Sequence, residues 1–205
     1  MKPKLLLFCA LQLALLSPAK SDSAPLNVDN LKDFTLLGFV PGQINFSAVE
    51  HSLHAVGSAK FSGMICIVAT TPDHTRITLW PNEFDDTLGG IQVTEGSYKL
   101  KWEAICQQSQ MVTRSVATAT GLRLGLSKDA VAAQYGKAKS RDEVGQLFGY
   151  SSDRPLTELE LKTACAKRAN PEGCSSEDYA YGGDIQLTFR KGKLVSFELS
   201  RGIYD

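Results

Sequence analysis

The chain has 205 residues, and its 22 Lys and Arg residues balance its 22 Asp and Glu residues. Binding to nucleic acid depends on clustered basic residues that neutralise backbone phosphates, so this balance argues against nucleic acid as a partner. A chain of this length can bury one sizeable hydrophobic core or two small ones.

The start of the chain predicts a secretory signal peptide. Two lysines precede an apolar run over residues 5–16, and small and polar residues follow it. The run falls well short of the roughly 20 residues that a membrane-spanning helix needs, and no later segment is long and apolar enough either. We expect cleavage after Ala19, or as late as residue 23, which leaves residues 20–35 as an N-terminal extension. The protein is then periplasmic or secreted.

Five cysteines become four when the signal peptide leaves with Cys9. An even set in an exported chain argues for two disulfides, although sequence alone permits three pairings among Cys66, Cys106, Cys165 and Cys174. A good turn sequence at 170–173 favours Cys165 with Cys174, which leaves Cys66 with Cys106. A reduced, nucleophilic thiol is the less favoured alternative.

The first half of the folded chain is expected over residues 36–119. It opens on Gly38 and Gly42, after which Asn45 is placed as the N-cap of a short helix that ends at Gly57. Strand-like segments follow at 63–71, 75–80, 89–95, 97–106 and 111–119.

The second half is expected over residues 120–205. Ser127 is a good N-cap, and Gly136 can adopt the left-handed conformation that ends a helix, so the pattern predicts a helix over residues 128–135. Two helical turns are not stable alone in water. The helix must therefore rest on a larger apolar surface.

The two halves begin with the same frame of glycines. Gly121 and Gly125 repeat Gly38 and Gly42 at an offset of 83 residues, and a cap and a short helix follow each pair. This match indicates an internal duplication of a whole supersecondary unit.

Two capping boxes are predicted after the second helix. Ser140 and Glu143 have the spacing of one, and Thr157 and Glu160 have the spacing of another, at the start of a helix in an insert over 151–180. Both boxes predict helix starts.

The end of the chain predicts a β-hairpin over residues 184–200. A two-residue turn would pair apolar residues with polar ones, so the pattern favours a three-residue loop, Arg190 to Gly192. In that register Leu187 faces Val195. The predicted fold is α+β, with two related halves that each pack a short helical segment on an antiparallel sheet.

The second half resembles a known family. GLRLGLSKDAVAAQYGK at 121–137, followed after an insert by DIQLTFRKGKLVSFEL at 184–199, is similar to small exported bacterial domains related to outer-membrane assembly lipoproteins and to the tandem-repeat β-lactamase inhibitor proteins. The resemblance covers 121–205 more fully than 38–107. It implies a short helical segment on an antiparallel sheet, present twice, with a disulfide in each half. The motifs are structural, so the resemblance assigns no functional residue.

No recognised catalytic, cofactor-binding or metal-binding motif occurs in the chain. His51 and His54 could offer two imidazoles to a metal, but no further ligands have matching spacing, so a position on the polar flank of the helix is favoured. The carboxylates in NEFDD at 82–86 lack the spacing of a calcium loop, and Glu158 and Glu160 point in different directions on a helix. We expect no metal and no cofactor.

Tyr179 and Tyr181 are the candidate partner-binding residues. They lie between the predicted disulfide loop and a strand, and tyrosines on constrained loops are good binding anchors. The alternative is that they are ordinary strand residues that share one face.

These observations favour an exported, non-enzymatic protein that binds another protein or a cell-envelope component, with inhibition of a hydrolase as a narrower version. The alternative is an exported hydrolase with a dispersed polar site. A pocket that joins a His to a Ser or Cys and a carboxylate would favour the enzyme, whereas an exposed aromatic and apolar patch would favour the binder.

Overall fold

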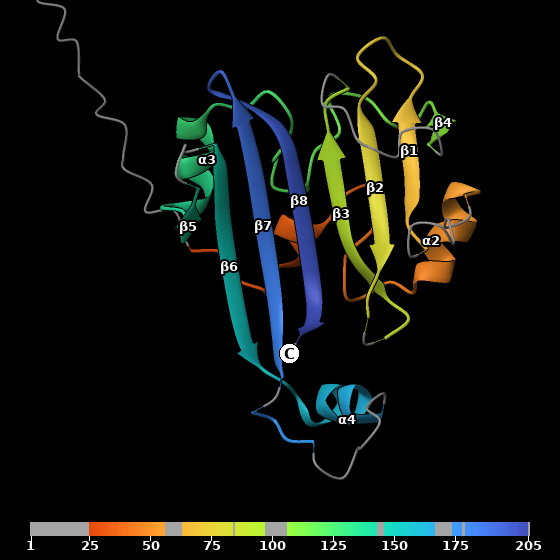
Figure 1. The fold of residues 1–205 in the computed structure, drawn as a ribbon, viewed down its shortest axis with the longest axis vertical. Helices are drawn as coiled ribbons and strands as arrows, with labels where there is room; N and C mark the ends of the chain where they lie inside the picture. The colour runs from red at the N-terminus through yellow and green to blue at the C-terminus, as the bar shows by residue number, and fades with distance from the viewer. Residues whose placement is uncertain are drawn as a thin grey trace, which may run out of the picture.

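The computed structural model describes residues 25–55, 63–83, 85–96, 106–142, 146–166, 174–177 and 179–204. Within these ranges eight strands form one sheet in the order β4-β1-β2-β3-β8-β7-β6-β5, and four short helices accompany it (Figure 1). All neighbouring strands are antiparallel except β1 and β4. The predicted α+β class is confirmed.

The strands are β1 (Ile65–Ala69), β2 (Arg76–Pro81), β3 (Leu88–Thr94), β4 (Gln107–Ser109), β5 (Ser140–Arg141), β6 (Leu147–Pro155), β7 (Ala180–Arg190) and β8 (Lys193–Tyr204). The helices are α1 (Leu31–Phe34), α2 (Phe46–Leu53), α3 (Lys128–Tyr135) and α4 (Glu158–Ala166). No helix of the described residues has the length and apolar character needed to cross a membrane.

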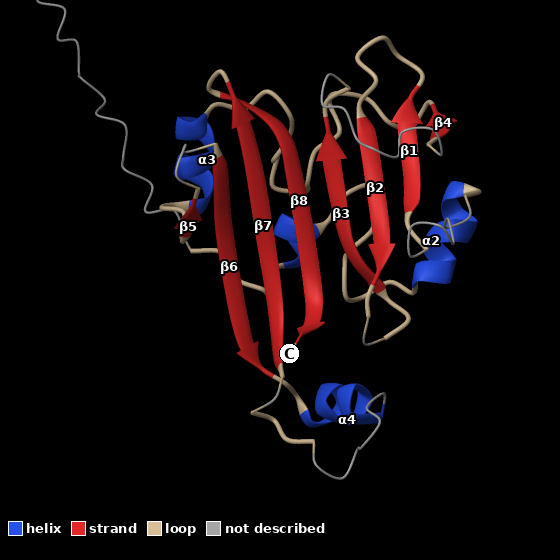
Figure 2. Cartoon of the chain, in the orientation of Figure 1, coloured by secondary structure: helices blue, strands red, loops and turns tan. Residues whose placement is uncertain are grey.

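One face of the sheet, here called the core face, carries the hydrophobic core. Rows of paired residues cross the strands on this face, and one row comprises Leu79, Ile91, Leu199, Ile185 and Tyr150. The buried apolar residues of α1, α2 and α3 belong to the same cluster as these strand residues. Figure 2 shows α1 behind the sheet. The short helices are thus stabilised by the sheet on which they rest.

Successive side chains of a strand point to opposite faces, so every second residue of each strand lies on the opposite face, here called the polar face. A row on this face comprises Thr78, Gln92, Glu198 and Gln186. Most of its members in β7 and β8 are polar, which is why the hairpin alternates so clearly in the sequence.

Helix α3 confirms the prediction for residues 128–135. The Ser127 hydroxyl oxygen accepts from the backbone N–H of Ala130 at 3.2 Å, and Gly136 has a φ of 76° and donates its N–H to the carbonyl of Ala132. The N-cap, the helix and the glycine that ends it therefore lie at the residues that the sequence predicted.

Helix α2 begins as predicted and ends earlier. The Asn45 side chain accepts from the backbone N–H of Ser47, which confirms the N-cap. The helix ends at Leu53, because His54 adopts a left-handed conformation with a φ of 49°. Gly57, the predicted stop, lies outside the described residues.

Four other predictions of elements need correction or lie outside the described residues. Residues 111–119 form loops with isolated bridges, and the short β4 precedes them. Ser140 lies in β5 and starts no helix. The strand β6 extends to Pro155, so the first residues of the predicted insert belong to the sheet. The expected strand over 97–106 lies outside the described residues except for Cys106.

The hairpin of β7 and β8 forms, but its predicted turn and register are wrong. Lys191 and Gly192 alone make the turn, with φ values of 50° and 74°, and Arg190 pairs with Lys193. A register shift next to Phe189 then brings Leu187 opposite Phe197. A β-bulge therefore restores the apolar pairing that a two-residue turn alone would lose.

Both predicted disulfides are present. Cys66 is bonded to Cys106 and Cys165 to Cys174, with Cα–Cα distances of 4.5 Å and 5.7 Å. The first holds β1 to the residue before β4, and the second joins α4 to a cysteine 9 positions further along the chain.

Part of the element order occurs twice along the chain. A short helix is followed by a three-stranded antiparallel meander, first as α2-β1-β2-β3 and then as α3-β6-β7-β8, but the second series also contains the two-residue β5 between α3 and β6 and the helix α4 between β6 and β7. The two meanders meet where β3 pairs with β8. The glycines that precede each helix all have positive φ: 82°, 72°, 91° and 84° at Gly38, Gly42, Gly121 and Gly125.

Two of these glycines give a matched test of local packing. Alanine at either Gly38 or Gly42 must adopt a left-handed conformation, which costs about 1 kcal/mol. At Gly38 the added Cβ meets nothing within 4 Å, whereas at Gly42 it would lie 2.6 Å from the hydroxyl oxygen of Tyr181 and 2.9 Å from the carbonyl oxygen of Arg201. We expect Gly42→Ala to lower the free energy of unfolding by roughly 1–3 kcal/mol more than Gly38→Ala. Chemical denaturation of both variants measures this difference, and equal losses would contradict the packing of Gly42 against Tyr181.

Candidate functional site

A hollow of about 280 Å³ opens on the polar face near the C-terminal end of the chain. Its lining includes Trp80, Gly182, Asp184, Ser200 and Tyr204. The pairing of the strands explains this grouping, because Trp80, Gly90, Ser200 and Asp184 form one row across β2, β3, β8 and β7. The hollow is thus formed by the sheet itself, with residues from strands of both meanders.

Two aromatic side chains flank the hollow, and each packs directly against a glycine. A Cβ at Gly90 would lie 2.1 Å from a ring carbon of Trp80, and a Cβ at Gly182 would lie 2.1 Å from a ring carbon of Tyr204. Glycine in a strand interior weakens the strand and often marks a close approach of another group. Here the glycines allow both rings to lie against the backbone of the sheet.

The floor of the hollow presents oxygen acceptors. Burial raises the pKa of the Asp184 carboxyl, and the nearby Lys139 opposes this effect. Burial likewise raises the pKa of Glu198 on the same face, whose carboxylate accepts a hydrogen bond from the Gln92 amide at 3.2 Å. Rings beside half-buried acceptors can bind a polar ligand or a partner's side chains.

The histidines lie away from this hollow. His51 and His54 are exposed at and just beyond the end of α2, with ring centroids 6.4 Å apart. Within the described residues no group of three His, Cys, Asp or Glu side chains could hold a metal ion. The prediction that these histidines lie on the polar flank of α2 is consistent with their exposure.

His74 lines a separate hollow with Asp73, Thr75, Glu95 and other residues. Among the described residues that line this hollow, Thr75 carries the only hydroxyl, so a hydrolytic site built from them would use it as the nucleophile. Thr75 is fully buried, and its hydroxyl donates to the Asp73 carboxylate at 2.8 Å. This geometry leaves the hydroxyl without access to a substrate and does not support the hydrolase alternative.

The two candidate tyrosines are both buried. Tyr179 and Tyr181 belong to a small apolar cluster with Val28, Ala164 and Ile203. This placement favours their interpretation as strand-associated core residues. Tyr181 still lines a third hollow, of about 420 Å³, at the junction of α4 with the sheet.

Two arginines enclose the ring of Tyr181. The guanidinium carbons of Arg154 and Arg201 lie 4.3 Å and 4.8 Å from the ring centroid. The buried Arg201 donates to the carbonyls of Val28 at 2.8 Å and Pro41 at 3.3 Å, and burial lowers its pKa. Arg201 therefore connects β8 to the N-terminal segment.

Arg154 of β6 connects α4 to the sheet. Its guanidinium donates two hydrogen bonds of 2.8 Å to the Glu160 carboxylate, which lowers the pKa of Glu160 to about 2. Glu160 also accepts from the Thr157 N–H, and the Thr157 hydroxyl accepts from the Glu160 N–H, so this predicted capping box is confirmed. These contacts explain how α4 is held and indicate a structural role for the third hollow.

The acidic loop also has a structural explanation. The Asp85 carboxylate accepts from the backbone N–H and the hydroxyl of Thr87, which closes the turn before β3. Glu160 binds Arg154, while Glu158 is exposed. The two glutamates therefore form no paired acid and base, as their spacing predicted.

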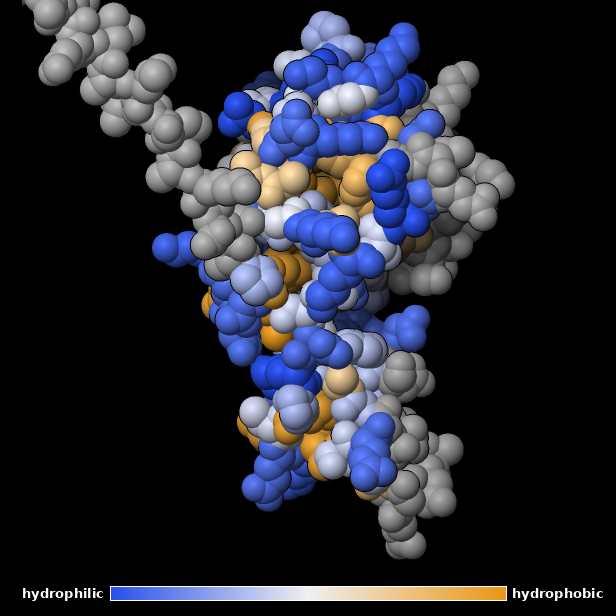
Figure 3. Space-filling model, turned by 90° about the vertical axis from the view of Figure 1, so that its left-hand side faces the viewer, coloured by the Kyte–Doolittle hydropathy of each residue, from blue (hydrophilic) through white to orange (hydrophobic). Residues whose placement is uncertain are grey.

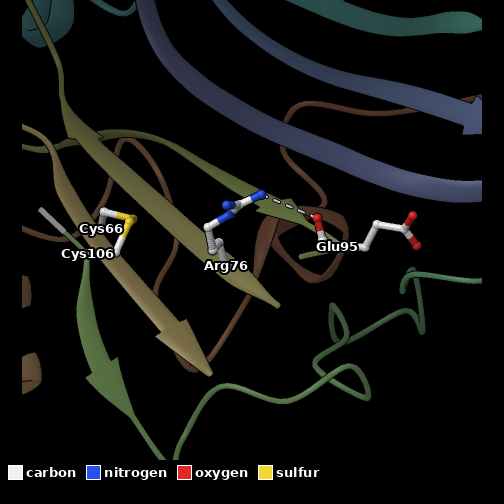
Figure 4. Close-up of a disulfide and its surroundings, with 4 residues drawn as sticks. All are labelled: Cys66, Arg76, Glu95 and Cys106. Atoms are coloured by element: carbon white, nitrogen blue, oxygen red, sulfur yellow. Dashed lines mark hydrogen bonds between the residues drawn. A yellow bond between two sulfur atoms is a disulfide. The ribbon is translucent and has the colours of Figure 1, made fainter. Parts of the chain in front are cut away.

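The Cys66–Cys106 disulfide lies on the polar face, beside Arg76 (Figure 4). Arg76 is buried and donates to the backbone carbonyl of Glu95 at 3.4 Å. The Glu95 carboxylate binds Arg190, and Arg114 lies 3.8 Å away. This end of the polar face is thus occupied by internal contacts, and the accessible aromatic hollow lies at the other end.

Sequence reasoning did not single out Trp80, Asp184 or Tyr204. The only signal was glycine within strand patterns, at Gly90 and Gly182, which indicates a close approach without naming the approaching group. The grouping becomes visible only when the strands are paired.

Comparison with models of protein families, with curated protein sequences and with solved structures finds no match for this chain. Its function is therefore argued from the geometry of these surfaces.

Proposed function

We propose that this chain is an exported, non-enzymatic binding protein that uses the polar face of its sheet to bind another protein or a cell-envelope component. The observation that supports this most directly is the hollow between Trp80 and Tyr204, with Asp184 and Ser200 between them. Inhibition of a hydrolase is a narrower version of the same proposal.

Energetic and structural arguments support the polar face as the binding surface. Trp and Tyr are the residue types most enriched among those that contribute most to binding, because each combines a large apolar surface with a polar group. Both rings here are carried by strands of one continuous sheet. A rigid support reduces the entropy that is lost when a partner binds.

The compartment proposed is the periplasm or the extracellular space. Two disulfides in a chain of this size fit an oxidising environment, since reducing conditions in the cytosol keep thiols free. Residues 1–19, the proposed signal peptide, lie outside the described residues.

We also propose that the two halves arose by duplication. The support is the repeated order of one helix and three strands, together with the positive φ at the two equivalent pairs of glycines. The likeness to tandem-repeat inhibitor proteins stays a prediction from the sequence.

The experiment is affinity capture from native envelope extract with the mature protein and two variants. Trp80→Ala combined with Tyr204→Ala removes both rings, whereas Met111→Ala removes an exposed apolar side chain that does not line the hollow. We expect a partner retained by the wild type and by Met111→Ala to be lost, by roughly tenfold or more, from the double variant. Equal capture by all three folded proteins would contradict the proposal.

A further inference from the structure

A groove of about 320 Å³ lies between α3 and the edge of the sheet formed by β5 and β6. The groove is on the helix side of the sheet and shares no residue with the aromatic hollow on the polar face. Figure 3 faces this edge of the molecule, where hydrophobic surface lies between hydrophilic side chains.

The floor of the groove is apolar and aromatic. Phe148 and Phe189 pack edge to face, with ring centroids 5.3 Å apart. The Tyr150 hydroxyl donates to the carbonyl of Gly136 at 3.2 Å, so its polar end already has a partner within the protein. Val131 and Ala132 of α3 complete the wall. An apolar body placed here would lose water on several sides at once.

Cations surround this floor. Among the described residues, four basic side chains and one acidic one line the groove, and the basic residues are Lys128, Lys137, Lys139 and Arg141. The chain as a whole has equal numbers of basic and acidic residues, so this excess is local. An anion is therefore the complementary ligand.

Two of these cations lie over the same ring. The Lys128 ammonium is 4.8 Å from the centroid of Phe148, and the Arg141 guanidinium carbon is 5.6 Å from it. An anionic head group beside Phe148 would therefore lie near both cations. A charged head and an apolar body would then be bound by adjacent parts of one site.

We propose that this groove binds a monomeric anionic amphiphile, a carboxylate with a medium-length alkyl chain, whose head contacts Lys128 and Arg141 and whose chain lies on Phe148 and Phe189. The volume is at the lower end of the range for small-molecule sites, which suits one short chain and excludes a folded partner. The proposal is independent of the function proposed for the polar face.

Isothermal titration calorimetry with decanoate below its micellar concentration tests the ligand class. Decyltrimethylammonium has the same chain with the opposite charge, and decanol has the chain without charge. We expect decanoate to bind at least roughly tenfold more tightly than either, because charge-assisted hydrogen bonds add to the burial of the chain. Equal binding of the cationic amphiphile would overturn the proposal.

Matched variants test the location. Ala132 and Ala133 are adjacent exposed residues of α3, and only Ala132 lines the groove. Ala132→Phe should fill the groove and abolish decanoate binding, while Ala133→Phe should leave it unchanged. Lys128→Gln combined with Arg141→Gln should weaken binding by roughly tenfold or more, and Lys193→Gln, at an exposed residue outside the groove, should not.

Three further results would overturn the inference. One is undiminished binding of decanoate to folded Ala132→Phe. Another is binding of phosphatidylglycerol vesicles without binding of decanoate, which would indicate a membrane surface as the ligand. The third is binding of an acidic peptide such as Glu-Asp-Phe-Glu in place of decanoate, which would indicate a protein segment.

Discussion

Phe197→Ala is expected to lower the free energy of unfolding by about 3–5 kcal/mol. Phe197 is fully buried and lies in β8, the strand that joins the two meanders. On the core face it pairs with Leu187 on one side and with Val93 on the other. Its removal would leave a cavity between the halves that neither can close alone, because close-packed interiors relax only partly.

Urea denaturation of the mature protein measures this loss, with Leu159→Ala as the control. Leu159 is 75% exposed on α4, so its truncation should change the free energy of unfolding by no more than about 0.5 kcal/mol. Similar effects of the two substitutions would contradict the assignment of Phe197 to a shared core.

Removal of the Cys66–Cys106 disulfide is expected to destabilise the protein by about 4 kcal/mol, and removal of Cys165–Cys174 by about 2.5 kcal/mol. The reason for the difference is loop length, since the two bonds span sequence separations of 40 and 9 residues. A longer closed loop restricts the unfolded chain more strongly.

The measurement compares Cys66→Ala/Cys106→Ala with Cys165→Ala/Cys174→Ala in the same denaturation assay. Each double variant is the control for the other, because both remove one disulfide and leave no free thiol of the pair. A larger loss on removing the shorter loop would mean that native contacts around α4, and not chain entropy, set the contribution of that disulfide.

The two proposed ligand surfaces lie on opposite sides of one sheet. The aromatic hollow occupies the polar face, and the groove lies where α3 meets β5 and β6. Trp80 and Tyr204 on one side and Ala132 on the other can therefore be changed independently. Loss of partner capture with retained decanoate binding, or the reverse, would separate the two proposals.

Local sequence was sufficient wherever the structure depends on neighbours in the chain. The caps at Asn45 and Ser127, the stop at Gly136 and the capping box of Thr157 with Glu160 all depend on groups within a few residues of one another. The pairing of Cys165 with Cys174 belongs to the same class, because the two residues are only 9 positions apart in the chain, whereas the predicted turn at 170–173 lies outside the described residues. Alternation of apolar residues likewise indicated most of the strands.

The predictions from sequence were wrong where contacts between residues far apart in the chain decide the local structure. The register of the final hairpin depends on a bulge that keeps Leu187 opposite Phe197. This register is favoured because it places both side chains in the core. Ser140 has the spacing of a helix cap but pairs with Gly149 as a strand, because the edge of β6 offers it hydrogen bonds. Local propensity is weaker than such tertiary contacts.

The sequence by itself indicated the α+β class, the helices α2, α3 and α4 and the repeated spacing of glycines, and it favoured the disulfide pairing that the structure has. It did so because hydrogen-bond caps, turn residues and side-chain periods act over short stretches of chain. Only the tertiary structure decided which side chains meet. Trp80, Asp184 and Tyr204 lie on three different strands, and Lys128 and Arg141 flank Phe148 from separate elements. No local rule relates such residues, since their proximity depends on strand order and on the packing of α3 against the sheet.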